Sequence, residues 1–297
     1  MNLKPLLFAL LLTATGCRRT TRSDDRADGG PPRLDYPRVV VGTDDSCLLD
    51  AAGYLSCWGR QPASHQPPKR AFAFVDFDTS GCGLARDGTL TCWPAAEMND
   101  VGAFPPGRYR VVSTRSAHAC AIRLDRTLVC WGKRGGMTNS PGGPFLDVSV
   151  GLSHVCAIRA DGTLTCWGES NSYRQASPPP GRFVQISSGG VMSCARNADN
   201  LVVCWGENDT FGSLHNRQAR SVHTGIKETC VIELDGALTC KGPYHAAAAP
   251  PDDISRPPPG RFVQMDMGTE HACALRADGT VACWGRDRHG ETKPPGG

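Results

Sequence analysis

Outside its first residues the chain has no long hydrophobic run, and it has few aromatic side chains and little excess of charge. After residue 16 no segment approaches the roughly 20 consecutive apolar residues that a transmembrane helix needs. Lys and Arg number 32 against 29 Asp and Glu, whereas nucleic-acid binding needs concentrated positive charge. We therefore expect no nucleic-acid partner, and membrane association only through a lipid anchor.

Residues 1–16 have the pattern of an export signal, in which Lys4 precedes an apolar stretch too short to span a bilayer. The following Ala14-Thr15-Gly16-Cys17 resembles the bacterial lipobox, in which the cysteine carries the lipid. An ordinary secretory signal is the alternative. Without Cys17, however, an even number of cysteines remains, as expected of an exported disulfide protein. Residues 17–35 are charged, rich in Gly and Pro and nearly free of apolar residues, so they predict a flexible, lipid-anchored tether.

These features predict a bacterial cell-envelope protein that is either periplasmic or exposed at the surface. Arg18 follows Cys17 at the place where enteric bacteria use an aspartate to retain lipoproteins in the inner membrane. This residue therefore favours the outer membrane. We expect the anchored domain to be monomeric.

The remaining cysteines follow a strict period. Fourteen of the 15 form seven pairs whose members are ten residues apart, and the pairs recur about every 37 residues. The pairs are Cys47 with Cys57, Cys82 with Cys92, Cys120 with Cys130, Cys156 with Cys166, Cys194 with Cys204, Cys230 with Cys240, and Cys273 with Cys283. Such a period indicates a repeat architecture.

Each cysteine pair brackets a predicted β-hairpin. Asp occupies the fifth position after the first cysteine in six units, and the sixth position is Gly in five units and Asn200 in another. This pattern is typical of a three-residue hairpin loop whose last residue has positive φ, so Arg126 at that position should cost stability. A turn centred on Asp278 sets Cys273 opposite Cys283 at a non-hydrogen-bonded position, where side chains approach most closely. We predict seven cross-strand disulfides, each within one hairpin.

Besides a catalytic thiol, against which seven recurring copies argue, two other roles are open to these cysteines. Zinc sites use ligand pairs about two to four residues apart, which the uniform spacing does not fit. Buried free thiols are the second alternative, because cysteine packs well as a small hydrophobe. Export favours oxidation over both.

Other residue types also recur at fixed places in the repeat. All six tryptophans directly follow a second cysteine, and Lys241 takes the seventh place. Histidines stand two residues before the first cysteine in three units, and arginines stand 12 before it in four (His118, His154, His271; Arg70, Arg108, Arg182, Arg261). A ligand-stacking cage, converging ligands or a basic rim would be functional interpretations. Recurrence in most units instead favours packing between units, hydrogen bonding of buried loops and a solvated ring of charges.

The last unit carries Gly268-x-x-His271-x-Cys273-Ala274-Leu275-x-x-Asp278-Gly279-x-Val281-x-Cys283-Trp284-Gly285. This motif resembles the repeat of the regulator of chromosome condensation family, in the cysteine-bearing version seen in exported bacterial proteins, including many lipoproteins. The match is clearest in units four and seven and extends over residues 36–297. The resemblance implies an all-β, seven-bladed β-propeller, in agreement with seven units that each cannot bury both faces alone. We expect the strand from Tyr36 to Gly42 to close the ring against the last hairpin.

A propeller fold does not identify a function, and three classes remain open. The first is a non-catalytic module whose propeller face binds a protein, the second an inhibitor of an envelope or secreted hydrolase, and the third an enzyme such as a glycosidase or lyase. Such enzymes need paired carboxylates or an activated nucleophile at one site, and no spacing here indicates one. We expect the binding module, with no catalytic residue, metal or cofactor.

Specificity should reside in the segments that break the repeat, namely 133–139, 208–214 and 244–255. The candidate partner-binding residues in or beside them are Lys133, Arg134, Met137, Asn208, Phe211, Lys241, Tyr244, His245, Asp252 and Asp253.

Overall fold

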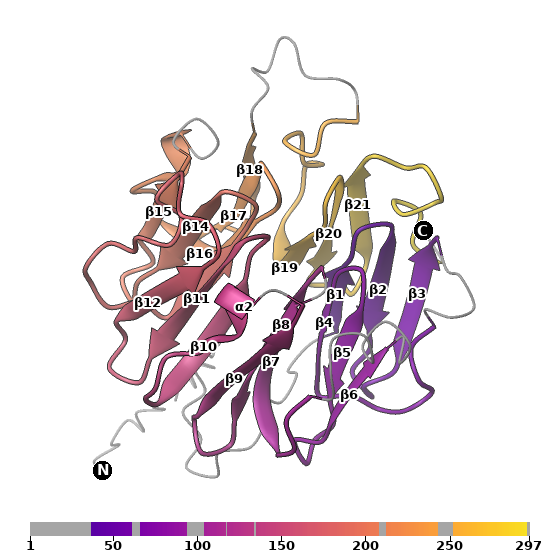
Figure 1. Ribbon diagram of the computed structural model, residues 1–297. Helices are drawn as coiled ribbons and strands as arrows, with labels where there is room; N and C mark the ends of the chain where they lie inside the picture. Colours follow the sequence, from indigo (N-terminus) through magenta and orange to yellow (C-terminus); the bar gives the residue numbers. More distant parts are fainter. Residues whose placement is uncertain are drawn as a thin grey trace, which may run out of the picture.

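Seven antiparallel sheets of three strands each follow one another in the computed structural model of the protein, and they are called blades 1 to 7 in chain order (Figure 1). The structure describes residues 37–60, 66–93, 104–116, 118–133, 135–207, 212–242 and 252–295. Each blade is a meander, because its three strands pair in the order in which they occur in the chain. The predicted all-β, seven-bladed propeller is confirmed.

The strands are short and follow one plan in every blade. Their bounds are β1 (Arg38–Val41), β2 (Asp45–Leu49), β3 (Leu55–Gly59), β4 (Phe74–Phe77), β5 (Gly81–Leu84), β6 (Leu90–Trp93), β7 (Tyr109–Arg115), β8 (His118–Arg123), β9 (Leu128–Gly132), β10 (Phe145–Val150), β11 (His154–Arg159), β12 (Leu164–Gly168), β13 (Gln185–Ser188), β14 (Met192–Arg196), β15 (Val202–Gly206), β16 (Ala219–Thr224), β17 (Thr229–Glu233), β18 (Leu238–Lys241), β19 (Phe262–Met267), β20 (His271–Arg276) and β21 (Val281–Gly285). The short helical segments α2 (Gly135–Thr138) and η3, a 3-10 helix (Gly212–Leu214), lie between blades. Among the described residues, no helix has the length and apolar character needed to cross a membrane.

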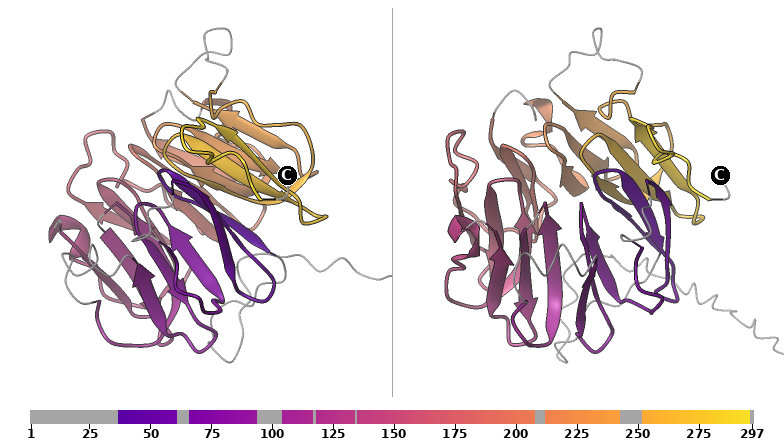
Figure 2. Two further views of the ribbon diagram at one scale, coloured as in Figure 1. Left: turned by 90° about the vertical axis from the view of Figure 1, so that its right-hand side faces the viewer. Right: turned by 45° about the vertical axis from the view of Figure 1, so that its right-hand side comes forward.

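The first strand of each blade faces the centre of the ring. It contacts the first strands of both neighbouring blades, and the series closes because β1 contacts β19. Figures 1 and 2 show the first and last blades, in indigo and yellow, side by side. The strand expected to close the ring against the last hairpin does lie beside the last blade. It pairs, however, with β2 in its own sheet, so the ring is closed by contacts between sheets rather than by a shared sheet.

All seven predicted disulfides are present, each between the second and third strands of one blade. They join Cys47 to Cys57, Cys82 to Cys92, Cys120 to Cys130, Cys156 to Cys166, Cys194 to Cys204, Cys230 to Cys240, and Cys273 to Cys283. The two cysteines of each pair face each other in the strand register, as the last pair shows. Free thiols and zinc ligation are therefore excluded for these 14 residues. Each bridge closes a hairpin and leaves neighbouring blades unlinked.

The hydrophobic core lies between blades rather than inside any one of them. One cluster joins Val39, Val41 and Trp58 of blade 1 to Cys273 and Leu275 of blade 7. Middle strands are buried on both faces because they are flanked by two blades, and β20 is buried from its first residue to its fifth. The recurring tryptophans fill these spaces, five of them at 8% exposure or less and Trp167 half-buried. Packing between units is thus the structural role of the repeated aromatic residues.

The hairpin turns adopt the predicted backbone conformation. Glycine at the sixth position after the first cysteine has positive φ, for example 86° at Gly162, and Asn200 has a φ of 65°. Arg126 takes the same conformation with a φ of 69°. A residue with a Cβ is disfavoured there, because Cβ approaches the following carbonyl oxygen.

We therefore expect the substitution Arg126→Gly to raise the free energy of unfolding by about 0.5–1 kcal/mol. The reverse change at the equivalent place, Gly162→Arg, should lower it by about 1–2 kcal/mol. Urea unfolding of the two variants and the parent measures both values. A stability loss in Arg126→Gly would contradict the account of backbone strain.

Candidate functional site

The antiparallel strands give the ring two different faces. The turn face carries the hairpin turns between second and third strands, such as 50–54 and 124–127. The loop face carries the turns between first and second strands, together with the connectors that follow the third strands. All three segments predicted to confer specificity follow a third strand, so they leave the ring on the loop face.

Four connectors on the loop face are each held by a buried residue whose carbonyl group accepts a hydrogen bond from a tryptophan of the next blade. The bonds run from Trp167 Nε1 to Met137, from Trp205 Nε1 to Gln175, from Trp284 Nε1 to Ile254 and from Trp58 Nε1 to Glu291, over 2.7–3.0 Å. The four accepting residues are at most 4% exposed. In the first three cases the acceptor lies 30 residues before the tryptophan. This contact fixes each connector at one point and leaves its flanking residues free to vary.

The predicted partner-binding residues fall into three groups. Lys133, Lys241 and Asp252 are exposed on the loop face. Met137 and Asp253 are buried. Arg134, Asn208, Phe211, Tyr244 and His245 lie outside the described residues, as does the predicted lipidation site Cys17.

Met137 and Asp253 correct the prediction. Met137 is 1% exposed because it packs in the core between blades 3 and 4, where its carbonyl receives the Trp167 bond. The carboxylate of Asp253 accepts hydrogen bonds from the backbone N–H and the hydroxyl group of Ser255, at 2.8 and 2.7 Å. Both residues shape their connectors, and neither offers a side chain to a partner.

Tyr173 is a candidate contact residue that the sequence analysis missed. Its side chain is 49% exposed, although its connector is well fixed: Tyr173 N donates to Gln175 Oε1, and Gln175 Nε2 donates to the Ser170 carbonyl, both at 3.0 Å. The segment was overlooked because it does not interrupt the repeat. The sequence feature that could have indicated this contact residue is a tyrosine within an otherwise polar connector.

Around the axis, polar side chains of one blade cover the free edge of the next blade's first strand. Val39 N and Val41 N of β1 donate to Gln264 Oε1 and Asp266 Oδ2 of β19, at 2.8 and 2.9 Å. The same bond recurs from Thr114 N to Asp76 Oδ2, from Val150 N to Ser113 Oγ, from Ser188 N to Ser149 Oγ and from Thr224 N to Ser187 Oγ, over 2.6–3.1 Å. Edge N–H groups need such partners. The polar residues lining the axis are therefore engaged in holding neighbouring blades together.

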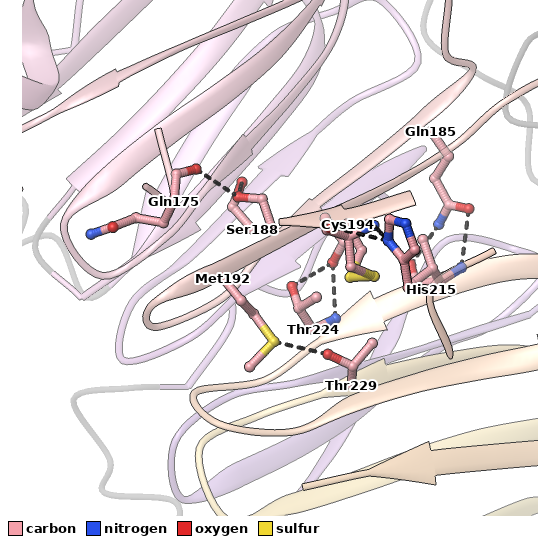
Figure 3. The surroundings of a disulfide bond; sticks show 12 residues. Gln175, Gln185, Ser188, Met192, Cys194, His215, Thr224 and Thr229 are labelled. Carbon is pink, nitrogen blue, oxygen red and sulfur yellow. Dashed lines mark hydrogen bonds between the residues drawn. A yellow bond between two sulfur atoms is a disulfide. The ribbon is translucent and has the colours of Figure 1, made fainter. Parts of the chain in front are cut away.

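Figure 3 shows one such junction, between blades 5 and 6 near Cys194. Gln185 reaches the backbone of Val222, donating to its carbonyl at 2.9 Å and accepting from its N–H at 3.2 Å. Farther toward the loop face, the Thr229 hydroxyl donates to the Met192 sulfur at 2.9 Å. Side-chain hydrogen bonds thus complement the apolar contacts between these blades.

Histidine and serine form an equivalent contact at two other junctions. His154 Nε2 lies 2.7 Å from Ser193 Oγ, and His271 Nε2 lies 2.8 Å from Ser46 Oγ. Burial lowers the pKa of His154 to about 4 and also lowers the pKa of His271. Both imidazoles and both serines are at most 1% exposed, so these pairs link blades and do not meet a substrate. Within the ranges described, no group of three His, Cys, Asp or Glu residues is arranged to hold a metal ion.

The seam between blades 7 and 1 also contains carboxyl groups that favour their protonated form. Asp45 is 9% exposed and its Oδ1 atom has no hydrogen bond. Burial, followed by the negative charges of Asp44 and Glu291, raises the pKa of Asp45 to about 7. Nearer the axis, burial and the charge of Asp76 raise the pKa of Asp266 to about 7. The seam therefore carries two carboxyl groups whose ionisation opposes folding.

Arginines on the turn face are engaged with neighbouring groups. Arg108, Arg182 and Arg261 donate to the backbone carbonyl of the turn aspartate in the preceding blade, and Arg108 and Arg261 also pair with its carboxylate. A second set lies over buried aromatic rings of the same blade: Arg123 over Tyr109, Arg159 over Phe145 and Arg276 over Phe262, at 4.9–5.9 Å from guanidinium carbon to ring centroid. These arginines are thus more than a solvated ring, because they fix turns and cover aromatic residues.

Two units of the chain match a known repeat. The model of the regulator of chromosome condensation (RCC1) repeat matches residues 145–175 and 262–291, which are the units where the motif is clearest. Two of the seven units thus match the RCC1 repeat. No curated protein matches the chain. The seven disulfides indicate that this propeller matures in an oxidising compartment.

Solved structures of similar fold include two plant receptor-kinase ectodomains. The entire ectodomain of the Physcomitrella patens receptor kinase CR4 matches with a TM-score of 0.70 and 23% identity, over 84% of this chain and 73% of that one. The CRINKLY WD40 ectodomain of Arabidopsis thaliana ACR4 matches with a TM-score of 0.68 and 21% identity, over 88% and 97%. Human WBSCR16 matches with a TM-score of 0.54 and 15% identity, over 87% and 78%. At these identities the likeness concerns the fold.

The Asp45 carboxyl gives a pH-dependent prediction. In the folded protein it keeps its proton up to about pH 7, whereas its unfolded pKa is near 3.8. The free energy of unfolding that the raised pKa of Asp45 contributes is therefore fully present below the unfolded pKa and is lost as the pH rises through the folded pKa. Relative to the parent, Asp45→Asn should gain roughly 1–2 kcal/mol of unfolding free energy between pH 5 and pH 8, a value that allows for solvent screening.

Urea unfolding at several pH values measures this difference. Asp278→Asn is the matched control: hydrogen bonds from Thr280 lower the pKa of Asp278, so its difference from the parent should stay constant above pH 5. An Asp45→Asn difference that did not change with pH would contradict the burial of an ionisable carboxyl at the seam.

Proposed function

We propose that this protein is a lipid-anchored lipoprotein of the bacterial cell envelope whose loop face binds another protein without catalysing a reaction. In this proposal Cys17 carries the lipid, residues 17–35 form the tether, and the outer membrane is the favoured site. The observation that carries the proposal is the construction of the loop face. Buried carbonyl–tryptophan bonds hold its connectors, which present exposed side chains outward.

Exposed residues of different chemistry stand on the connectors. Lys133 and Tyr173 lie on the connectors that follow β9 and β12. Lys241 is the last residue of β18, and Asp252 lies between β18 and β19. The first two connectors touch, since a Cβ on Gly136 would lie 3.0 Å from the Glu169 Cγ atom. Tyrosine is enriched at protein interfaces, and a fixed connector reduces the entropy lost on binding. These properties support a protein-binding surface centred on Lys133 and Tyr173.

Crosslinking in native envelopes, followed by capture of tagged full-length protein, identifies the partner and tests the face. We expect one protein to be recovered in stoichiometric amount by the parent. The double variant Lys133→Ala/Tyr173→Ala should weaken its affinity for the recovered protein by about tenfold or more, as the loss of an interface tyrosine usually does.

A matched double variant on the turn face is the control. Tyr54→Ala/Arg220→Ala removes a tyrosine of similar exposure, 53% against 49%, and should bind as the parent does. The opposite pattern, with binding lost only in the control variant, would place the interface on the turn face and contradict the proposal. Recovery of no stoichiometric protein would sink the binding-module proposal. If the partner is a hydrolase, an assay of its activity distinguishes inhibition from simple binding.

A further inference from the structure

One sector of the turn face is markedly basic. It belongs to blades 2 and 3 and contains Lys69, Arg70, Arg86, Arg108, Arg123 and Arg126. The turns of the same two blades supply the carboxylates Asp87 and Asp125. We call this set of six cations the basic sector.

Two members of the basic sector stand where all the other blades carry uncharged residues. At the fourth position after the first cysteine, four blades have alanine, whereas blade 2 has the exposed Arg86. At the sixth position five blades have glycine and blade 5 has asparagine, whereas blade 3 has Arg126 with a φ of 69°. A side chain kept at a strained position is a sign that its chemistry is used. Arg126 therefore adds charge where the other blades carry glycine or asparagine, and Arg86 adds charge where the other blades carry alanine or leucine.

An exposed apolar side chain lies within the same sector. Leu124 occupies the tip of the blade 3 turn, at the position equivalent to Arg86, and is 37% exposed. Aliphatic side chains surrounded by Lys and Arg are typical of surfaces that rest at a membrane interface, where the apolar group enters the headgroup region and the cations meet anionic lipids.

The chain also enters the ring beside the basic sector. β1 begins at Arg38, which pairs with Leu49 at the turn-face end of blade 1. The Arg38 guanidinium carbon lies 5.0 Å from the ring centroid of Phe74 in blade 2. If residues 17–35 form the tether of the proposed function, a chain of about 20 residues has a root-mean-square length of roughly 25 Å. A lipid at Cys17 would therefore keep this face, rather than the loop face, next to the membrane.

We propose that the basic sector binds an anionic lipid surface, so that the propeller rests on its turn face and directs its loop face away from the membrane. The tether argument rests on the proposed lipid anchor, while the charge and Leu124 arguments do not. A soluble acidic polymer would satisfy the cations alone. It would make no use of the exposed leucine, and for this reason the lipid surface is the occupant that fits.

Vesicle co-sedimentation tests the proposal without the anchor. The mature chain, residues 17–297 carrying Cys17→Ser, is mixed with vesicles of phosphatidylcholine alone or with about one third phosphatidylglycerol. We expect binding only to the anionic vesicles and a steep loss of binding with added salt. Lys69→Glu/Arg86→Glu should reduce the partition coefficient by roughly tenfold or more, because each cation near an anionic surface contributes several-fold.

Two matched controls accompany these variants. Lys227→Glu/Arg174→Glu makes the same charge change at exposed sites of the loop face and should bind like the parent. Leu124→Ala should weaken vesicle binding several-fold, whereas Leu234→Ala, at the equivalent turn tip of blade 6, should have no effect. Unchanged disulfide content confirms that each variant is folded.

Three outcomes would overturn the proposal: no binding of the parent to anionic vesicles, equal binding to both kinds of vesicle, or equal losses in the basic-sector and loop-face variants. A Leu124→Ala variant that binds vesicles like the parent would contradict insertion of Leu124 into the headgroup region and remove the argument for a lipid surface over a soluble polyanion. None of these measurements involves partner capture by the loop face, so the proposed protein-binding function is tested independently of them.

Discussion

Hydrogen bonds from the free edge of each first strand to side chains of the neighbouring blade are the contacts on which the ring depends. A three-stranded sheet has an edge at the axis whose N–H groups pair with no other strand, and such groups need partners. Gln264 and Asp266 supply them between blades 7 and 1, and Ser113, Ser149 and Ser187 do so elsewhere. Because the disulfides lie within blades, non-covalent contacts hold one blade against the next. Besides these edge bonds they comprise apolar packing, the histidine–serine pairs, and the tryptophan and arginine bonds to backbone carbonyls.

The two faces of the ring differ in how much their segments vary from blade to blade. Hairpin turns on the turn face have nearly the same length in every blade, so differences between blades there are differences of side chain, such as Arg86, Leu124 and Arg126. Connectors on the loop face vary in length and sequence, and four of them are held at one buried residue by a tryptophan of the next blade. In the two proposals, the uniform face rests on a flat lipid surface and the variable face binds a specific partner.

Much of the fold can be predicted from the sequence because the same pattern of cysteine and turn residues recurs, with few exceptions, in seven units. The cysteine spacing fixes the hairpin register, and the positive φ of Arg126 follows from the glycines at the equivalent positions. The buried state of Met137 and Asp253 was not predictable in this way. Segments that break the repeat are expected to be exposed. The residue that binds the Met137 carbonyl is a tryptophan 30 residues later, in the next blade, so the local sequence does not indicate the contact. Tyr173 was missed for the opposite reason, since its segment keeps the repeat.

Closure of the ring is the central claim, and amide hydrogen exchange of β1 tests it most directly. Val39 and Val41 donate away from their own sheet to Gln264 and Asp266, so their amides should exchange slowly in the parent and much faster in Gln264→Ala/Asp266→Ala. In Gln185→Ala, which removes the equivalent bond from Val222, β1 should remain protected. Rapid exchange of Val39 and Val41 in the parent protein would contradict a closed ring.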